Sequence, residues 1–231
     1  MSSPAREDYF LKRVAIFANG QLPRPTALQE IISISDLLVA ADGGLRLALS
    51  LGVIPHIIIG DLDSASKDDL DQARKQGSEL ELFPRDKDET DLELALRYVI
   101  DAGCDIIRII GGLGGRSDQT LANLLLLADP ALRDKDIRLD DGLEEAFVIH
   151  DRVEIEGSPG DTLSLLPLDG PCGGIRTDGL RFPLRGETLL PYRTRGISNA
   201  MTGSRATVTL EKGMLLCIHR RDSLPSSPIT G

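Results

Sequence analysis

Two carboxylates, Asp61 and Asp63, follow directly on a short β-branched run, Ile57 to Ile59. In extended backbone, residues two apart point the same way, so both side chains are expected to converge where this strand ends. Carboxylates held together repel unless one is protonated or a cation lies between them. Mg²⁺, which binds carboxylates together with substrate phosphates, is the natural cation. The alternative interpretation is an Asp-rich turn that caps the next helix.

A second acidic segment, residues 83–91, has the sequence FPRDKDETD and again places carboxylates between a predicted strand and a predicted helix. No single cation could bind all of them, so several must be helix caps or solvated surface. One more carboxylate beside Asp61 and Asp63 would be sufficient for a metal site.

A glycine-rich segment, residues 111–119, has the sequence GGLGGRSDQ and lies between another strand and another helix. Glycines let backbone N–H groups approach an anion, the following helix N-terminus favours phosphate, and Arg116 adds a bidentate donor. The segment is not a Walker A loop, and Ser117 stands where G-x-G-x-x-G would need its last glycine. The sequence therefore predicts a phosphate site, with a generic glycine turn as the alternative.

Two further predicted strand ends carry the same kind of residue, Asn19-Gly20 and Asp42-Gly43-Gly44. Five consecutive strand ends are thus polar or glycine-rich. In an open α/β sheet, ligands bind at the carboxyl ends of the strands. These segments are therefore expected to share one edge of a sheet.

The elements that must position these segments alternate between strand and helix along residues 1–143. Apolar, β-branched runs predict buried strands at 14–18, 37–41, 57–59, 80–83 and 106–110. Helical patterns occupy roughly 26–34, 45–51, 66–76, 90–102 and 118–128, and Thr90 with Glu93 forms a capping-box pattern. The fold class expected is α/β, with a mostly parallel N-terminal sheet that has helices on both faces.

The pattern changes after about residue 144. Strand-like segments at 152–155, 162–166, 206–210 and 214–218 are separated by Gly, Pro and Asp turns, with no helix between them. Residues 144–220 are therefore expected to form a smaller all-β sandwich domain. The polar, proline-bearing residues 221–231 are expected to be a disordered tail.

Composition excludes several classes of protein. The 231 residues carry 26 Lys and Arg against 36 Asp and Glu, a net charge of −10, and 41% are hydrophobic. A dense acidic block at 61–93 disfavours a nucleic-acid-binding face. No apolar stretch approaches the roughly 18 residues of a membrane span. Three widely spaced cysteines fit reduced thiols in the cytoplasm.

The order and approximate spacing of five motifs resemble those of the thiamine pyrophosphokinases over about residues 13–219. The motifs are DGG at 42–44, GDLDS at 60–64, KDETD at 87–91, GGLGGRSDQ at 111–119 and GISN at 196–199. Each motif is modest by itself, but the ordered set is specific.

The resemblance implies a transfer of diphosphate from ATP to thiamine, giving AMP and thiamine diphosphate, with Mg²⁺ as cofactor. It also implies an N-terminal α/β domain, a C-terminal β-sandwich, and a homodimer whose active sites lie between subunits.

The resemblance also implies roles for particular residues. By similarity, the metal and phosphate cluster consists of Asp61, Asp63 and Asp88, and Asp118 orients the alcohol or accepts its proton. Residues of the ATP site are Asn19, Asp42, Gly43, Ser64, Thr90, Asp91, Arg116 and Gln119. Ser198 and Asn199 resemble the thiamine-contacting pair.

One departure from the family pattern concerns aromatic residues. This chain has no Trp, whereas many relatives have a Trp or Tyr in the segment that here reads GLRFPL, residues 179–184. Phe182 is the local candidate for a ring stacked on thiamine.

Two alternative functions remain open from the sequence. One is a diphosphokinase on the same scaffold that acts on another alcohol, such as a hydroxymethylpterin. The other is a nucleotide-binding regulatory module without turnover.

Overall fold

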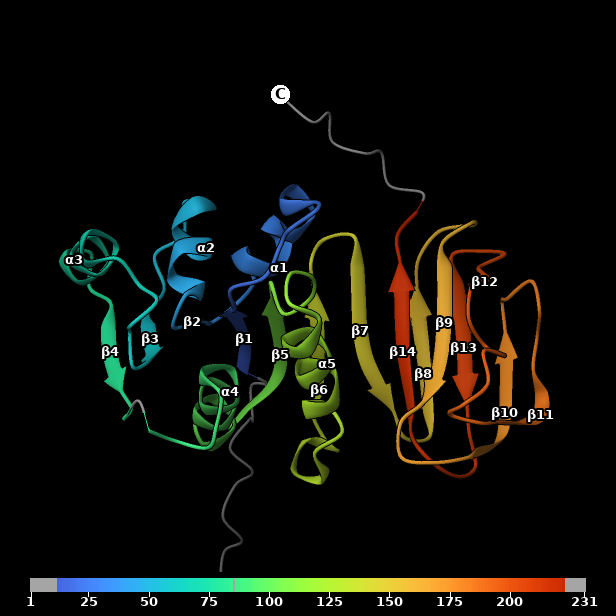
Figure 1. Ribbon diagram of the computed structural model, residues 1–231. Helices are drawn as coiled ribbons and strands as arrows, with labels where there is room; N and C mark the ends of the chain where they lie inside the picture. Colours follow the sequence, from blue (N-terminus) through green and yellow to red (C-terminus); the bar gives the residue numbers. More distant parts are fainter. Residues whose placement is uncertain (1–11, 85, 223–231) are drawn as a thin grey trace, which may run out of the picture.

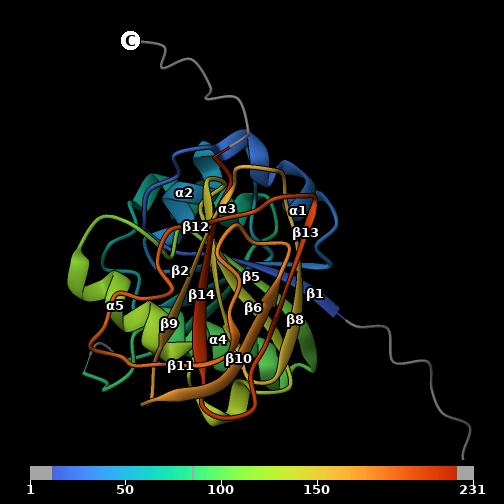
Figure 2. The same ribbon diagram turned by 90° about the vertical axis from the view of Figure 1, so that its right-hand side faces the viewer.

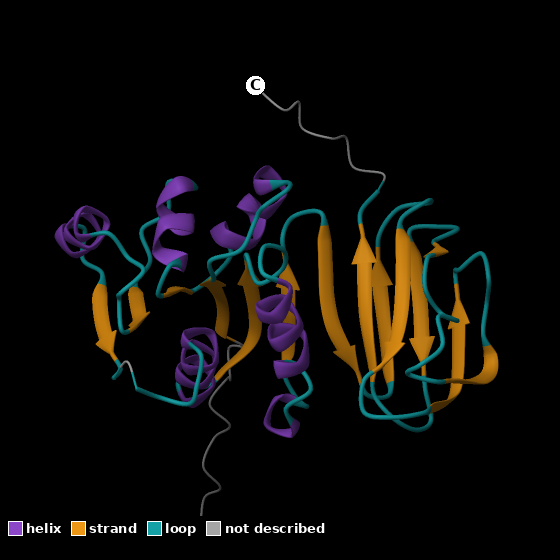
Figure 3. Cartoon of the chain, viewed as in Figure 1, coloured by secondary structure: helices purple, strands orange, loops and turns teal. Residues whose placement is uncertain are grey.

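A computed structural model describes residues 12–84 and 86–222 and contains one large sheet and one small sheet (Figure 1). The ten-stranded sheet has the order β12-β9-β14-β7-β6-β5-β1-β2-β3-β4, and the four-stranded sheet has the order β11-β10-β13-β8. Figure 3 shows that the helices gather over the half of the large sheet that ends at β4.

Six parallel strands form that half of the large sheet. In chain order they are β1 (Lys12–Phe17), β2 (Leu37–Ala41), β3 (Ile57–Gly60), β4 (Glu79–Leu82), β5 (Cys104–Ile110) and β6 (Asp136–Asp140). The helices between them are η1 (Pro25–Leu28), α1 (Gln29–Ser33), α2 (Gly44–Ser50), α3 (Lys67–Lys75), α4 (Asp91–Asp101), α5 (Ser117–Leu126) and η2 (Pro130–Leu132). The predicted alternation of strand and helix is confirmed.

Both faces of this half are buried, which explains why its central strands read as continuous apolar runs. In β1, Val14 and Ile16 face the core that contains Leu96 of α4, whereas Ala15 and Phe17 face the core that contains Ala48 of α2. Helices therefore cover both faces: α1, α2 and α3 lie on one side, and α4 and α5 on the other (Figure 1).

Strand β4 differs from the buried apolar strand that the sequence predicted. It is the edge strand, its four residues are exposed or half-buried, and Leu82 is 63% exposed. Glu79 and Glu81 fit this edge position because charged side chains discourage further strand pairing.

The large sheet continues past residue 144 without a break and becomes antiparallel. Its added strands are β7 (Glu144–Ile149), β14 (Leu215–Arg220), β9 (Thr162–Pro167) and β12 (Asn199–Ala200). The small sheet contains β8 (Arg152–Glu156), β10 (Cys172–Asp178), β11 (Arg185–Leu189) and β13 (Arg205–Thr209). Figure 2 views the molecule from this end.

The small sheet packs against the antiparallel half of the large one. Their shared core joins Phe147, Leu163 and Cys217 of the large sheet to Ile175 and Val208 of the small sheet. The predicted β-sandwich following an α/β sheet is therefore confirmed. The boundary at residue 144 stays a prediction, because β7 belongs to the same sheet as β6.

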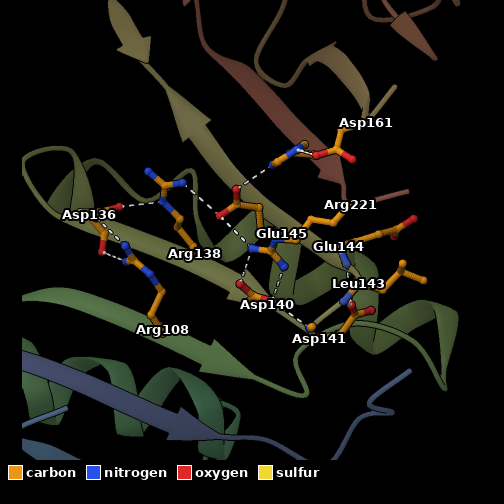
Figure 4. Close-up of polar contacts among 12 residues, drawn as sticks. Arg108, Asp136, Arg138, Asp140, Asp141, Leu143, Glu144, Glu145, Asp161 and Arg221 are labelled. Atoms are coloured by element: carbon orange, nitrogen blue, oxygen red, sulfur yellow. Dashed lines mark hydrogen bonds and ion pairs between the residues drawn. The ribbon is translucent and has the colours of Figure 1, made fainter. Parts of the chain in front are cut away.

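Strand β6 was not among the predicted strands, although its sequence DIRLD alternates polar and apolar residues, which is the pattern of a half-buried strand. Figure 4 shows why these residues can be half-buried: Arg138 binds Asp136 and Glu145 at 3.0 Å each. Glu145 in turn binds Nδ1 of His219 at 3.0 Å. The polar side chains of β6 are therefore paired within the strand and with residues of β5, of β7 and of the segment after β14.

The start of the expected disordered tail is ordered. Arg221 binds both carboxylate oxygens of Asp140, at 2.9 and 2.8 Å, and its carbonyl accepts a hydrogen bond from Arg24. Asp222 accepts a hydrogen bond from Thr162. The buried carboxylate of Asp140 thus ties Arg221 to the sheet, and the rest of the expected tail, residues 223–231, lies outside the described residues.

Two smaller expectations concern membranes and thiols. Among the described residues, no helix has the length and apolar character needed to cross a membrane. Cys104, Cys172 and Cys217 are all buried and form no disulfide. Burial raises the pKa of each of these thiols above its usual value.

Candidate active site

Three carboxylates meet where β2 and β3 end. Asp42 follows β2, and Asp61 and Asp63 follow β3. One oxygen from each of Asp42, Asp61 and Asp63, the carboxylate trio, lies within 4.8 Å of the other two. Oxygen atoms at this spacing could all contact one divalent cation.

Asp42 is the most unusual member of the carboxylate trio. It is only 8% exposed, its φ is +41°, and its Oδ1 has no hydrogen-bond partner among the residues that the structure describes. A buried carboxylate oxygen without a partner is costly, and so is a left-handed backbone at a residue other than glycine. Both observations fit a site built to hold a cation.

The side chains of Asp61 and Asp63 come together through a turn after β3, and not through the extended strand that the sequence predicts. Leu62 has a φ of +62°, and the N–H of Asp63 donates to Oδ1 of Asp61 at 3.1 Å. The hydroxyl of Ser64 donates to Oδ1 of Asp63 at 3.2 Å. A tight Asx-type turn therefore holds these two carboxylates near each other.

Asp91 lies beside the carboxylate trio. A Cβ placed on Gly60 would stand 2.9 Å from Oδ1 of Asp91 and 3.1 Å from Cβ of Asp42, so only glycine fits between these residues. Asp91 is the first residue of α4, whose N-cap is Thr90, and the Thr90 hydroxyl accepts the N–H of Glu93 at 3.2 Å. The helix start therefore delivers Asp91 to the site.

The structure does not place Asp88 in the carboxylate trio. Asp88 is exposed in the segment before α4, whereas Asp42 occupies the third position. The family resemblance implies a role for Asp42 in the ATP site and not among the metal ligands. The signal that could have identified it is its position at the end of a central strand, directly before Gly43 and Gly44.

The glycine-rich segment lies next to the first two strand ends. A Cβ on Gly20 would come within 2.2 Å of the Gly111 carbonyl oxygen, and a Cβ on Gly43 would come within 2.8 Å of the Asn19 amide. Asn19, Gly43 and the start of the glycine-rich segment therefore form a continuous surface along the carboxyl edge of the sheet.

Arg116 and Asp118 pair with each other at the start of α5. Two nitrogens of Arg116 contact the two oxygens of Asp118, at 3.1 and 2.6 Å, and both side chains are exposed. The bonds from Arg116, helped by the N–H of Gln119, lower the pKa of Asp118. Asp118 is therefore ionised, and the Arg116 guanidinium is held at a helix N-terminus, where anions bind.

The predicted thiamine-contacting residues gather elsewhere, around a pocket of about 130 Å³ in the β-sandwich. Its lining includes Leu163, Leu165, Phe182, Ile197 and Asn199. The Asn199 amide both accepts from the N–H of Phe182 and donates to its carbonyl, at 2.9 and 2.7 Å. These two hydrogen bonds to the backbone hold the Phe182 segment in place. Phe182 itself is 63% exposed.

Ser198 is held in a left-handed turn next to this pocket. Its φ is +58°, and its N–H donates to the hydroxyl of Ser164 at 3.0 Å. Ser198 is exposed and lies between Ile197 and Asn199, which line the pocket, so it stands at the pocket's edge.

The pocket and the carboxylate trio are far apart within one chain. The pocket lies on β9, and Asp42 follows β2, six strands along the large sheet. At about 4.8 Å per strand, six steps span roughly 29 Å. A single chain does not bring the two together (Figure 1).

Comparisons with known proteins match both halves of the chain. The family model described as "Thiamin pyrophosphokinase, catalytic domain" matches residues 28–139, which contain the carboxylate trio. The model described as "Thiamin pyrophosphokinase, vitamin B1 binding domain" matches residues 150–215, which contain the pocket. The chain belongs to the thiamin pyrophosphokinase family.

Individual relatives agree with this assignment. The chain is similar to thiamine pyrophosphokinase of Bacillus subtilis, with 29% identity over 92% of this chain and 100% of the relative. The crystal structure of thiamine pyrophosphokinase from Bacillus subtilis has a TM-score of 0.80 at 28% identity, covering 90% of this chain and 99% of that one. A family member from Enterococcus faecalis has a TM-score of 0.77 at 26% identity, covering 91% and 100%.

Proposed function

We propose that this chain is a thiamine diphosphokinase, which transfers the diphosphoryl group of ATP to the hydroxyethyl oxygen of thiamine and releases AMP. The observation that carries the proposal is the match to a vitamin B1 binding domain over residues 150–215, which include every residue lining the sandwich pocket. This match favours thiamine over another alcohol such as a hydroxymethylpterin. The match to a catalytic domain favours an enzyme over a regulatory module.

Asp42, Asp61 and Asp63 would hold Mg²⁺, and the unpartnered Oδ1 of Asp42 supports this assignment. When bound there, the ion supplies positive charge that offsets the charge of the triphosphate. Asp91 lies next to Asp42 across Gly60 and would join the same site when the ion binds. Asp88, which the sequence placed among the ligands, is assigned no metal contact here.

The glycine-rich segment and Arg116 would bind phosphate oxygens of ATP, with Asn19, Gly43, Ser64, Thr90 and Gln119 around the nucleotide. In the transfer, the thiamine hydroxyl oxygen attacks the β-phosphorus, and the bond from that phosphorus to the oxygen of AMP breaks. Such reactions depend mainly on positioning and charge, so no strong nucleophile is needed. Asp118 would orient the hydroxyl or accept its proton late. Its lowered pKa keeps it ionised at neutral pH but makes it a weaker base, so orienting the hydroxyl is the role that the geometry favours.

Thiamine would bind in the sandwich pocket against Phe182, with Ser198 and Asn199 at its edge. Because one chain separates this pocket from the carboxylate trio by roughly 29 Å, we propose a homodimer in which each active site combines the trio of one subunit with the pocket of the other. The three buried thiols support a reducing, cytoplasmic setting.

The test is to incubate the protein with ATP, Mg²⁺ and one alcohol at a time, and to separate AMP from ADP. AMP formed only with thiamine supports the proposal. AMP formed with a pterin alcohol and not with thiamine would replace it with the other diphosphokinase. Nucleotide binding without AMP formation would favour a regulatory module without turnover.

A further inference from the structure

Lys87 is a half-buried cation that pairs with Asp91 near the carboxylate trio, and the proposed reaction gives it no role. Its Nζ lies 2.6 Å from Oδ1 of Asp91, with side chains that are 13% and 28% exposed. The same Nζ is 5.9 Å from the centre of the Phe83 ring. Lys87 is therefore held in place by an ion pair and by an aromatic face.

The oxygen that Lys87 binds also faces Gly60, which separates it from Asp42. Oδ1 of Asp91 would be 2.9 Å from a Cβ on Gly60, and Cβ of Asp42 would be 3.1 Å from the same point. Lys87 thus neutralises a carboxylate that lies across Gly60 from Asp42, the member of the trio with an unpartnered Oδ1. An ammonium ion and a divalent ion at this edge attract the same oxygen.

We propose that Lys87 is a built-in counter-ion that competes with the divalent cation for Asp91, and so makes tight metal binding depend on the nucleotide. This inference rests on the proposed metal site at the trio. Without nucleotide, a metal that recruits Asp91 must displace the ammonium, which costs the ion pair. With ATP present, the three donors of the ammonium have phosphate oxygens as alternative partners.

The test is direct titration of the nucleotide-free protein with Mn²⁺, followed by electron paramagnetic resonance of the free ion. We expect Lys87→Met to lower the Mn²⁺ dissociation constant roughly tenfold, the change that corresponds to the loss of one competing ion pair of ordinary strength. Lys87→Arg keeps the charge and should bind Mn²⁺ like the wild type. Lys87→Gln serves in place of Lys87→Met if that variant does not fold.

A double-mutant comparison separates competition from a general effect of charge. In an Asp91→Asn background, Lys87→Met should change Mn²⁺ affinity less than twofold, because the shared oxygen's charge is gone. Arg97→Met removes another ion pair of α4, from Arg97 to Glu93 at 2.7 Å, and should leave Mn²⁺ affinity unchanged. Unchanged or weaker Mn²⁺ binding in Lys87→Met, or a full effect without Asp91, would overturn the inference.

The variant Asp63→Asn tests the proposed metal site independently of Lys87. If Asp63→Asn does not weaken Mn²⁺ binding, the proposed site at the trio fails, and the inference fails with it. If Asp63→Asn abolishes binding while Lys87→Met binds Mn²⁺ like the wild type, only the role of Lys87 is lost. Thiamine-dependent AMP formation tests the proposed function independently of both.

Discussion

At the residue scale, Asp42 carries the strongest structural signal of function. A carboxylate that is 8% exposed, has an unpartnered oxygen and adopts a positive φ destabilises the fold in which it sits. Residues of this kind gather at functional sites, where a ligand removes the penalty. Asp61 and Asp63 add negative charge to the same site.

The trio and Asp88 can be separated by mutation. We expect Asp63→Asn to lower kcat by roughly 10³-fold, because it removes a charged oxygen that orders the metal and the phosphates. Asp88→Asn should lower kcat less than about tenfold, because Asp88 is exposed and outside the trio. The measurement is thiamine-dependent AMP formation at saturating ATP, with circular dichroism to confirm folding. Equal losses in both variants would restore Asp88 to the metal site.

At the element scale, the starts of helices and the ends of strands do the positioning. Helix α4 begins at Asp91 because the side chain of Thr90 caps it, and its apolar stripe, including Leu92 and Leu96, packs under the parallel strands. Buried packing fixes the helix axis, and the cap fixes the residue at which it starts. Together they determine where Asp91 and Lys87 lie.

Loss of this cap should be measurable. We expect Thr90→Ala to lower the free energy of unfolding by about 1 kcal/mol, because the N–H of Glu93 loses its acceptor. Thr90→Ser should recover most of this loss. Urea denaturation of the three proteins measures it. If Thr90→Ala were as stable as the wild type while its KM for ATP rose, Thr90 would act on the nucleotide and not as a cap.

At the scale of the whole molecule, one sheet joins the catalytic half to the sandwich. The polar cluster of Figure 4 bridges this junction, because Glu145 on β7 contacts Arg138 on β6 and His219 on β14. Burial by itself would raise the pKa of Glu145, but His219, Arg138 and Arg221 outweigh it and lower that pKa to about 2. The junction is therefore stabilised by a carboxylate that must stay ionised.

The sign of the resulting pH dependence follows from linkage. Because the pKa of Glu145 is lower in the folded state, its stabilisation is complete above the unfolded value near 4.5 and is lost as pH falls toward 2. A shift of this size corresponds to about 3 kcal/mol.

We expect Glu145→Gln to be less stable at pH 7 and to lose less stability than the wild type between pH 5 and pH 2. Glu156→Gln, at an exposed ion pair with Arg205, is the control and should follow the wild type closely. Thermal unfolding at a series of pH values measures both. If Glu145→Gln and the wild type lost the same stability between pH 5 and pH 2, the assignment would be contradicted.

The proposed dimer is tested by mixing two inactive variants. Asp63→Asn disables the trio, and Phe182→Asp disables the pocket. If each active site uses the trio of one subunit and the pocket of the other, hybrid dimers contain one intact site. Co-refolding the two variants should restore about a quarter of wild-type activity, since half the dimers are hybrids with one of two sites working. No recovery, with hybrid dimers detected by mass spectrometry, would place each site within one subunit.

Several features followed from the sequence because they depend on local pattern. Alternating apolar runs and helical stripes predicted the parallel sheet, and Thr90 with Glu93 predicted the start of α4. The pair Asp61 and Asp63 is two residues apart, so its members stay close in any compact fold. The ordered motifs predicted the family.

Other features depended on which distant segments meet. Asp42 is 19 residues before Asp61, and only the pairing of β2 with β3 brings it to the trio in place of Asp88. The partners that let β6 bury charged residues, Arg108, Glu145 and Arg221, come from distant segments. Sequence determined the chemistry available at each strand end, since residue type and short spacing are local. Tertiary structure decided which groups share one cation and that the pocket lies six strands away, because strand order sets every long distance in a sheet.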